Sequence, residues 1–378
     1  MKTHLSLFLA LALSLTIASC GGGSGTFGTT DNSTEVKTND WAKERLGGKV
    51  KSIRQRVYWA LEKFGRMDKG KLQNIKSQDY LKEYNEDGFL TAETFFDVRD
   101  SVVSSRKITY TDAGQIEKEE YYDAHKLSTL IKYTYDNKKL QQKEISDGSG
   151  KLKERYAYSY YDNGALMDED KFNASNQLSQ KIIHTYDAGN KLTEKQYFWG
   201  GGTLYKKETL EYKNAGIASI VTTKYQKKEE FFDGMIQYAD YNSFMDYEKR
   251  YLFDKNEQKV EVNTYGYDKY GNLTLSQTNK RLKVTPAETS ASENNTLTQE
   301  DGGNESEGVD NESEVTEGSD DGGEPYIEEE EELWDVPTGA AYEYQYDEQN
   351  NWTQKITYKI DKGEPIRQFY YERVVLYY

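Results

Sequence analysis

The sequence predicts an all-β protein, a repetitive antiparallel β-hairpin meander that forms a long curved or spiralling sheet. Three observations lead to this prediction. A seven-residue pattern recurs at a nearly constant spacing, and the segments between its copies alternate apolar and polar residues. The composition agrees with a sheet whose apolar side is largely Tyr, with 33 Tyr against 13 Phe among 378 residues. A fixed spacing of this size indicates one supersecondary unit that is copied along the chain.

The repeated pattern is clearest at residues 186–192, which read Tyr-Asp-Ala-Gly-Asn-Lys-Leu. Successive copies between Tyr84 and Tyr238 are separated by 26, 25, 25, 26, 26 and 26 residues. The fifth position is Gly or Asn in all copies except one, and these residues adopt positive φ most readily. We therefore predict a tight hairpin turn at each copy, with the left-handed residue at Gly88, Gly114, Gly164, Asn190, Gly216, Asn242, Gly271 and Asn350.

A second, looser turn is expected about half a period after each tight turn, for example at residues 147–150 and 199–202. Asp at the second or third position of the pattern, as at Asp187, can bond back to the turn backbone. Two turns in each period leave two strands of about eight residues, joined as a meander.

The predicted strands have one aromatic face and one polar face. At residues 131–135 and 156–160, aromatic or aliphatic side chains alternate with small or charged ones. A sheet of this many strands accumulates twist and cannot stay flat, so we expect the aromatic side on its concave face. A transmembrane barrel is the competing architecture, but its outward face would have to be apolar. Here the second face is rich in Lys and Glu, as at residues 117–120.

The pattern Tyr-Asp-x-x-Gly-x-Leu, as at residues 267–273, resembles the YD-repeat, or rearrangement-hot-spot, family of bacterial surface and toxin proteins. The resemblance extends from Tyr84 to Leu273 and resumes at Tyr346. It implies a spiralling β-sheet, which closes into a shell in large members of the family. This chain departs from the family in its longer period, in the residue after Gly, which is not Arg, and in lacking a C-terminal toxin segment. We therefore carry over the sheet and not the shell.

Residues 1–20 are predicted to be a lipoprotein signal peptide. Lys2 precedes an apolar stretch at residues 5–17, and Ile-Ala-Ser then precedes Cys20, the only cysteine of the chain. This arrangement resembles the bacterial lipobox, which implies lipidation of Cys20 and attachment to a membrane. The alternative is an ordinary signal peptide with an incidental cysteine. Because Gly21 follows the cysteine where Asp would imply the inner membrane, the resemblance implies the outer membrane.

The rest of the chain divides by composition. Residues 21–40 are rich in Gly, Ser and Thr and are predicted to be a flexible tether. Residues 41–285 form the β-repeat domain, and residues 336–378 supply its final repeat and C-terminal strands. Between them, residues 286–335 hold 19 Asp and Glu and no Lys or Arg, so we predict a disordered acidic insertion. A calcium site there is less favoured, because no alternating EF-hand-like ligand pattern is present.

The sequence predicts no catalytic residues, no metal site and no cofactor. His125 and His184 each stand alone in a repeat and are expected to be turn or sheet positions. The chain lacks the common hydrolase and phosphate-binding motifs. Acidic pairs for glycoside hydrolysis stay open, because Asp and Glu are abundant throughout. Nucleic-acid binding is not expected, because no basic patch dominates.

Two functional hypotheses follow. The first is a non-enzymatic envelope lipoprotein whose β-repeat scaffold binds a protein partner. The second is glycan binding, with or without glycan processing, through exposed tyrosines and tryptophans. Most tyrosines are in phase with the repeat and are expected in the sheet core. The cluster Tyr197, Phe198 and Trp199 is out of phase, which makes it the candidate binding patch.

Overall fold

The computed structural model describes residues 39–213, 216–226, 229–282 and 334–378. The chain divides into two units, one of residues 1–280 and 336–378 and the other of residues 281–335. The predicted signal peptide, Cys20, nearly all of the tether and most of the acidic insertion lie outside the described residues. In the second unit, Arg281 and Trp334 form an isolated antiparallel bridge.

The described part of the first unit consists of one short helix and a series of strands. These are α1 (Asp40–Lys43), β1 (Val50–Lys63), β2 (Arg66–Leu72), β3 (Tyr80–Tyr84), β4 (Leu90–Phe96), β5 (Val102–Tyr110), β6 (Ile116–Asp123), β7 (Lys126–Asp136), β8 (Lys139–Asp147), β9 (Leu152–Tyr160), β10 (Leu166–Asn173), β11 (Leu178–Tyr186), β12 (Leu192–Trp199), β13 (Leu204–Lys213), β14 (Gly216–Gln226), β15 (Glu229–Tyr241), β16 (Tyr247–Phe253), β17 (Lys259–Tyr267), β18 (Leu273–Lys280), β19 (Thr338–Tyr346), β20 (Trp352–Asp361) and β21 (Glu364–Tyr377).

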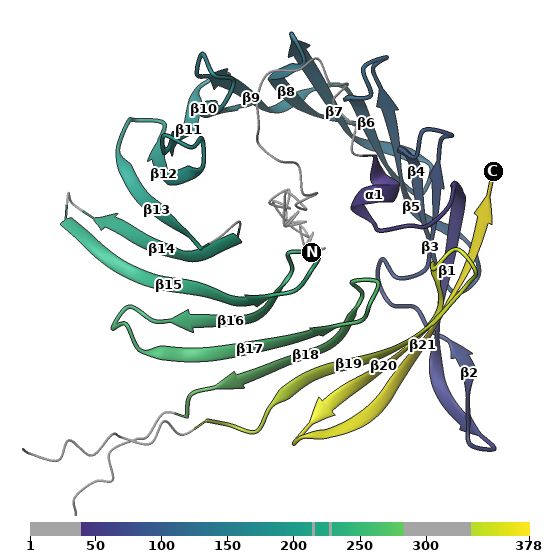
Figure 1. Ribbon diagram of the computed structural model, residues 1–378. Helices are drawn as coiled ribbons and strands as arrows, with labels where there is room; N and C mark the ends of the chain where they lie inside the picture. Colours follow the sequence, from purple (N-terminus) through teal and green to yellow (C-terminus); the bar gives the residue numbers. More distant parts are fainter. Residues whose placement is uncertain (1–38, 214–215, 227–228, 283–333) are drawn as a thin grey trace, which may run out of the picture. The chain divides into compact units, whose positions relative to one another are not determined.

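The strands from β3 to β21 pair antiparallel with their neighbours in sequence, which confirms the predicted hairpin meander. The prediction of an open curved or spiralling sheet is wrong. β1 pairs with β21 on one side and with β3 on the other, so 20 strands form a closed ring (Figure 1). β2 pairs only with the second half of β1 and stays outside the ring. Closure pairs both edges of the meander, which an open sheet would leave exposed.

Turns at both ends of the strands share one hydrogen-bond pattern. The Asp187 N–H donates to the Lys191 carbonyl over 2.9 Å, and the Asn190 N–H donates to the Asp187 carbonyl over 3.0 Å. The same pair of bonds is present in turns that begin at Asn85, Asp97, Thr111, Asp147, Tyr161, Asn173, Trp199, Asn242, Asp254, Asp268 and Asp347. The second turn of a period therefore has the same geometry as the first in these cases, and the expectation that it is looser is wrong.

Six of the eight predicted turn residues have a left-handed backbone. They are Gly88 (φ 82°), Gly114 (φ 75°), Gly164 (φ 89°), Asn190 (φ 61°), Gly271 (φ 80°) and Asn350 (φ 65°). The structure contradicts the assignment at Asn242, which begins its turn. The Asn242 side chain accepts the Phe244 and Asp246 N–H groups, and the left-handed residue is Met245, at φ 62°. This copy of the pattern starts at Tyr241, three residues later than predicted.

Gly216 is the other correction, because it is not left-handed. It is the first residue of β14 and pairs with Lys213 of β13. A Cβ at this position would lie 2.7 Å from the ring of Tyr241. Glycine is therefore suited to the close approach of a tyrosine ring rather than to positive φ.

The inner face of the ring carries the core. Trp41 of α1 and the nearby Leu46 pack on a cluster of buried side chains made of Val50, Ile53, Tyr80, Tyr84, Leu90 and Ile108. Figure 1 shows α1 inside the ring. Because side chains alternate across a strand, this face also holds the in-phase tyrosines. The concave face is thus the aromatic one.

The in-phase tyrosines are bonded from one hairpin to the next. The Tyr110 hydroxyl donates to the Leu90 carbonyl over 2.8 Å, and Tyr160 donates to the Leu140 carbonyl over the same distance. Equivalent bonds run from Tyr135 to Ile116, Tyr212 to Leu192, Tyr267 to Tyr247 and Tyr344 to Leu273. Each acceptor is the first or second residue of the returning strand of the preceding hairpin. A buried tyrosine ring with a bonded hydroxyl explains why the repeat uses tyrosine rather than phenylalanine.

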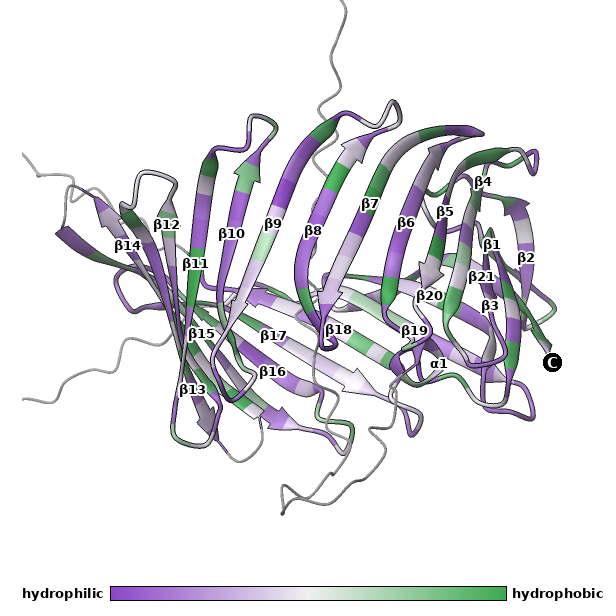
Figure 2. Ribbon diagram, turned by 90° about the horizontal axis from the view of Figure 1, so that it is seen from above, coloured by the Kyte–Doolittle hydropathy of each residue, from purple (hydrophilic) through white to green (hydrophobic). Residues whose placement is uncertain are grey.

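The outer face is polar over β6 to β9. Lys118, Lys132, Glu144 and Arg155 are successive cross-strand partners in a row over β6, β7, β8 and β9. Figure 2 shows hydrophilic residues in strands all around the ring. Among the described residues, no helix is both long enough and apolar enough to span a membrane.

A segment that we call the strap, residues 39–49, connects hairpin turns that are far apart in sequence. Arg45 donates to the Gly271 carbonyl over 2.6 Å and to both carboxylate oxygens of Asp246. The Gly47 N–H donates to the Asn351 side chain over 2.9 Å. At its other end, the Asn39 amide donates to the Asp87 carbonyl over 2.7 Å. The strap therefore ties together four hairpins at one end of the ring.

Candidate functional site

The structure does not bring the three residues of the predicted aromatic patch together. Trp199 is 54% exposed and stacks on Tyr205, with ring centroids 4.1 Å apart. Tyr197 lies on the same face, but its hydroxyl donates to Glu208 over 2.7 Å. Phe198 points to the opposite face, because adjacent residues of a strand alternate. The exposed aromatic pair is thus Trp199 and Tyr205. Tyr205 was missed because the register shift between β12 and β13 that places it there has no clear sequence signal.

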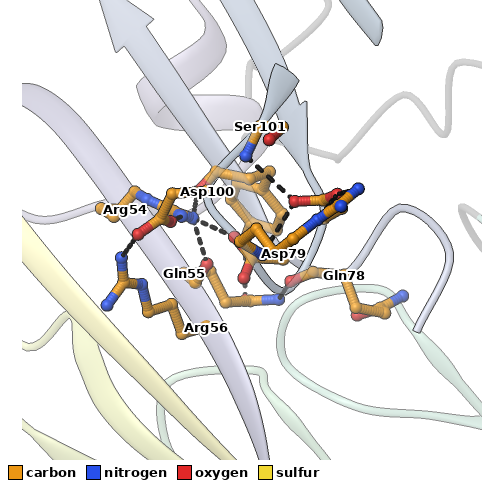
Figure 3. Close-up of polar contacts among 10 residues, drawn as sticks. Arg54, Gln55, Arg56, Gln78, Asp79, Asp100 and Ser101 are labelled. Atoms are coloured by element: carbon orange, nitrogen blue, oxygen red, sulfur yellow. Dashed lines mark hydrogen bonds and ion pairs between the residues drawn. The ribbon is translucent and has the colours of Figure 1, made fainter. Parts of the chain in front are cut away.

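A group of charged residues lies on the outer face where the ring closes (Figure 3). We call it the closure clasp, made of Arg54, Arg56, Asp79 and Asp100. Arg54 forms an ion pair with Asp79 and donates to Asp100 over 2.9 Å, and Arg56 donates to Asp100 over 2.5 Å. Arg54 also donates to the Tyr80 carbonyl over 3.1 Å. These bonds join β1 to β3 and to the turn after β4.

The closure clasp has the properties of a structural contact rather than a ligand site. Its two guanidinium groups are matched by two carboxylates. Asp79 is only 4% exposed, and burial raises its pKa although Arg54 acts in the opposite direction. The clasp lies where β1 changes its partner from β3 to β2. Charges that neutralise one another at this junction can hold β1 against β3, and they leave no net charge to attract a ligand.

A second polar group lies on the inner face, and we call it the cationic box. It consists of Lys355, Arg373, Trp352 and Tyr371. The Lys355 ammonium lies 4.1 Å from the centroid of the Tyr371 ring and 5.2 Å from that of Trp352. The Arg373 guanidinium carbon lies 3.4 Å from the centroid of the Trp352 ring. Both cations therefore contact aromatic faces, as cation–π pairs do.

The partners of Arg373 are neutral. Its Nε donates to the Gln55 side chain over 3.0 Å, and its Nη2 donates to the Tyr80 hydroxyl over 2.6 Å. Within the described part of the chain, no carboxylate forms an ion pair with Arg373 or Lys355. Burial, and then the charge of Arg373, lower the pKa of Lys355 to about 8. The cationic box is therefore charged at neutral pH without a matching acid.

Ring closure assembles the cationic box. Lys355 pairs with Tyr371 across β20 and β21, and Arg373 pairs with Gln55 across β21 and β1. Gln55 in turn pairs with Tyr80 of β3. Sequence reasoning missed the box because its supporting residues come from the first and last strands, which it had no basis to place side by side.

No metal centre is formed in the part of the chain that the structure describes. No group of three or more His, Cys, Asp and Glu side chains there could hold an ion. His184 is buried in β11, where burial, followed by the charge of Lys195, lowers its pKa to about 4. His125 is exposed in the turn after β6. The absence of a cofactor stays a prediction.

Comparison with known proteins gives only distant structural similarities. No protein family and no curated protein matches the chain. A porin-like protein from Bacteroides uniformis ATCC 8492 is similar over 86% of this chain and 98% of its own, at 9% identity and a TM-score of 0.27.

Two toxin structures are similar over smaller shares of their own chains. TcdB2-TccC3 matches 84% of this chain and 16% of its own, at 12% identity and a TM-score of 0.35. The Photorhabdus luminescens Tc holotoxin pore matches 83% of this chain and 18% of its own, at 10% identity and a TM-score of 0.24. At these TM-scores neither these nor the porin-like structure supports a statement about function. The resemblance to YD-repeat proteins stays a prediction.

Proposed function

We propose that the protein is a non-enzymatic lipoprotein of the bacterial envelope, attached through lipidated Cys20, whose closed β-ring is a scaffold that binds a protein partner. The observation that carries the proposal is the polar outer face of β6 to β9. The membrane-facing surface of a transmembrane barrel is an apolar band with aromatic residues at its borders. The row Lys118, Lys132, Glu144 and Arg155 crosses the middle of four strands instead. Attachment to a membrane then depends on the N-terminal signal.

The regular hairpins suit a scaffold. Tyrosine hydroxyls bond one hairpin to the next, and the strap ties four hairpins together. These bonds favour a rigid frame. Rigid frames lose little conformational entropy when a partner binds. The proposed location in the outer membrane depends on Gly21, the residue after Cys20, and is part of the same proposal.

Metabolic labelling with a radioactive fatty acid tests the attachment. The wild-type chain is expected to take up label and to fractionate with outer membranes, and a Cys20→Ala variant is expected to lose the label. A Cys20→Ala variant that stays labelled, or an unlabelled wild-type chain, would contradict a lipoprotein. Crosslinking of intact cells, followed by purification of the protein, then tests for a specific protein partner.

Glycan binding is the second candidate, and the exposed stack of Trp199 on Tyr205 favours it. An indole with one covered and one open face is a surface on which a sugar ring can pack. A glycan array compares the wild type with Trp199→Ala. Trp59→Ala is a matched control, because Trp59 is 46% exposed and stacks on Phe369 with centroids 4.9 Å apart. Binding lost only in Trp199→Ala would establish this candidate, and equal binding by all three proteins would reject the stack as the site.

A further inference from the structure

The cationic box holds two cations for which the described chain supplies no carboxylate partner. On β19, Tyr342 and Tyr344 face Lys355, and on β21 Tyr371 and Arg373 face it. None of these side chains is an acid. The inner face has carboxylates elsewhere, and they are used: Glu119, for example, accepts from Arg106 over 2.9 Å and from Tyr121 and Tyr133. Arg373 and Lys355 have no such carboxylate partner in the described part of the chain.

Such a pair opposes folding unless something offsets it. Two like charges repel, and each loses part of its hydration when it is partly buried. The contacts with Trp352, Tyr371, Gln55 and Tyr80 offset some of this cost but supply no negative charge. An anion that binds between the cations would supply it, because it meets both charges in a setting of lower dielectric than bulk water.

The geometry also leaves donors free. The Nε and Nη2 of Arg373 have partners, while its Nη1 and the Lys355 Nζ form no hydrogen bond in the described part of the chain. Gln55 and Tyr80 fix the guanidinium from one side, so its remaining edge has a defined direction. Lys355 approaches the same Trp352 ring, at 5.2 Å from the centroid.

We infer that the cationic box binds a small molecule through its carboxylate, with the rest of the ligand against the Trp352 ring. A carboxylate has two oxygens, which match one guanidinium edge and one ammonium. The flanking aromatic ring favours a ligand with an organic body over a bare inorganic anion. An acidic sugar such as a uronic acid combines the two features. This site is distinct from the Trp199 stack and does not depend on the lipid anchor.

The binding has a defined pH dependence. A carboxylate ligand meets two cations only while Lys355 is protonated. Affinity is therefore greatest below the folded-state pKa of Lys355 and falls as the pH rises through it. The bound anion, by favouring the charged ammonium, raises that pKa in the complex.

Isothermal titration calorimetry of the full-length protein in detergent tests the site. The probes are D-glucuronate, D-glucose as its neutral counterpart, acetate and inorganic phosphate. Glucuronate is expected to bind more tightly than acetate, and glucose is not expected to bind. Lys355→Gln is expected to weaken glucuronate binding about tenfold or more. Lys355→Arg, which keeps the charge, is expected to retain most of it and shows whether the site tolerates substitution.

Lys359→Gln is the matched control. Lys359 lies on the same strand and face but is exposed and paired with Asp361 at 3.7 Å, so its loss is expected to leave binding unchanged. Three results would overturn the inference: equal binding of glucuronate and glucose, tighter binding of phosphate than of any carboxylate, or equal glucuronate binding by wild type and Lys355→Gln. Absence of heat with millimolar glucuronate and folded protein would overturn it too.

Discussion

The guanidinium of Arg45 donates to both oxygens of the Asp246 carboxylate, at 2.8 and 2.9 Å, although the two residues are 201 positions apart. Arg45 belongs to the strap, and Asp246 lies in the turn between β15 and β16. A third bond joins Arg45 to the Gly271 carbonyl in the turn between β17 and β18. A contact of such long sequence separation fixes distant hairpins of the ring against one another.

Arg45→Ala is expected to destabilise the folded protein by about 1–2 kcal/mol, because a two-oxygen ion pair and a charge-assisted bond to a carbonyl are lost together. Urea unfolding followed by tryptophan fluorescence measures the change. Lys63→Ala serves as the control, since Lys63 pairs only with Asp68 in the neighbouring strand and both are exposed. An equal effect of the two substitutions would mean that the strap does not hold the hairpins.

The backbone conformation of one turn residue gives a second prediction. Glu257 is left-handed, at φ 61°, and it is exposed in the turn between β16 and β17. Glu257→Gly is therefore expected to stabilise the fold by about 0.5–1 kcal/mol through relief of backbone strain. Glu248→Gly in the adjacent strand β16 is expected to destabilise it, because glycine loses more entropy in a strand. Thermal unfolding compares the two variants, and a Glu257→Gly variant that melts lower would contradict the turn geometry.

The turns also show how much of the fold could be predicted from the sequence. A spacing of 25 or 26 residues with Gly or Asn after Tyr was enough to place the hairpins, because positive φ limits which residues fit there. It failed at Met245, which takes that conformation although its residue type does not signal it. Closure could not be predicted either, because it depends on the register of β1 with β21 and β3, which no local pattern encodes. The cationic box depends on closure and was missed with it.

The tyrosine bonds between hairpins provide a third prediction. Tyr160→Phe removes the hydroxyl that donates to the Leu140 carbonyl over 2.8 Å and is expected to cost about 1 kcal/mol of stability. Tyr158→Phe is a close control, because Tyr158 lies on the same strand and face, and its hydroxyl forms no hydrogen bond in the described chain. Equal unfolding midpoints for the two variants would show that the bond contributes nothing to stability.

His184 gives the stability a pH dependence. Burial, and then the charge of Lys195, hold its folded-state pKa at about 4, below the ordinary value of 6.5. Between these values the unfolded chain takes up a proton that the folded protein does not, so stability falls as the pH falls from about 6.5 to about 4. The contribution of this one residue approaches about 1.4 kcal/mol per pH unit within that window.

His184→Gln is expected to flatten this part of the stability profile, measured by urea unfolding at several pH values. The exposed His125 provides the comparison, and His125→Gln is expected to leave the profile unchanged. A profile of equal slope in wild type and His184→Gln would place the acid sensitivity in the carboxylates instead.

The closure clasp yields the last prediction, which concerns the ring itself. Asp79→Ala leaves the Arg54 guanidinium, whose side chain is 21% exposed, with only Asp100 and backbone carbonyls as partners. The loss of a nearly buried carboxylate beside an arginine is expected to destabilise the fold by about 2–3 kcal/mol. Because the clasp joins β1 to β3, the backbone amides of Ser52–Gln55 and Tyr80–Glu83 are expected to exchange hydrogen faster, while those of β9 and β10 keep their protection. Uniformly faster exchange would instead mean that Asp79 supports the whole sheet, and unchanged exchange at the seam would mean that strand pairing alone closes the ring.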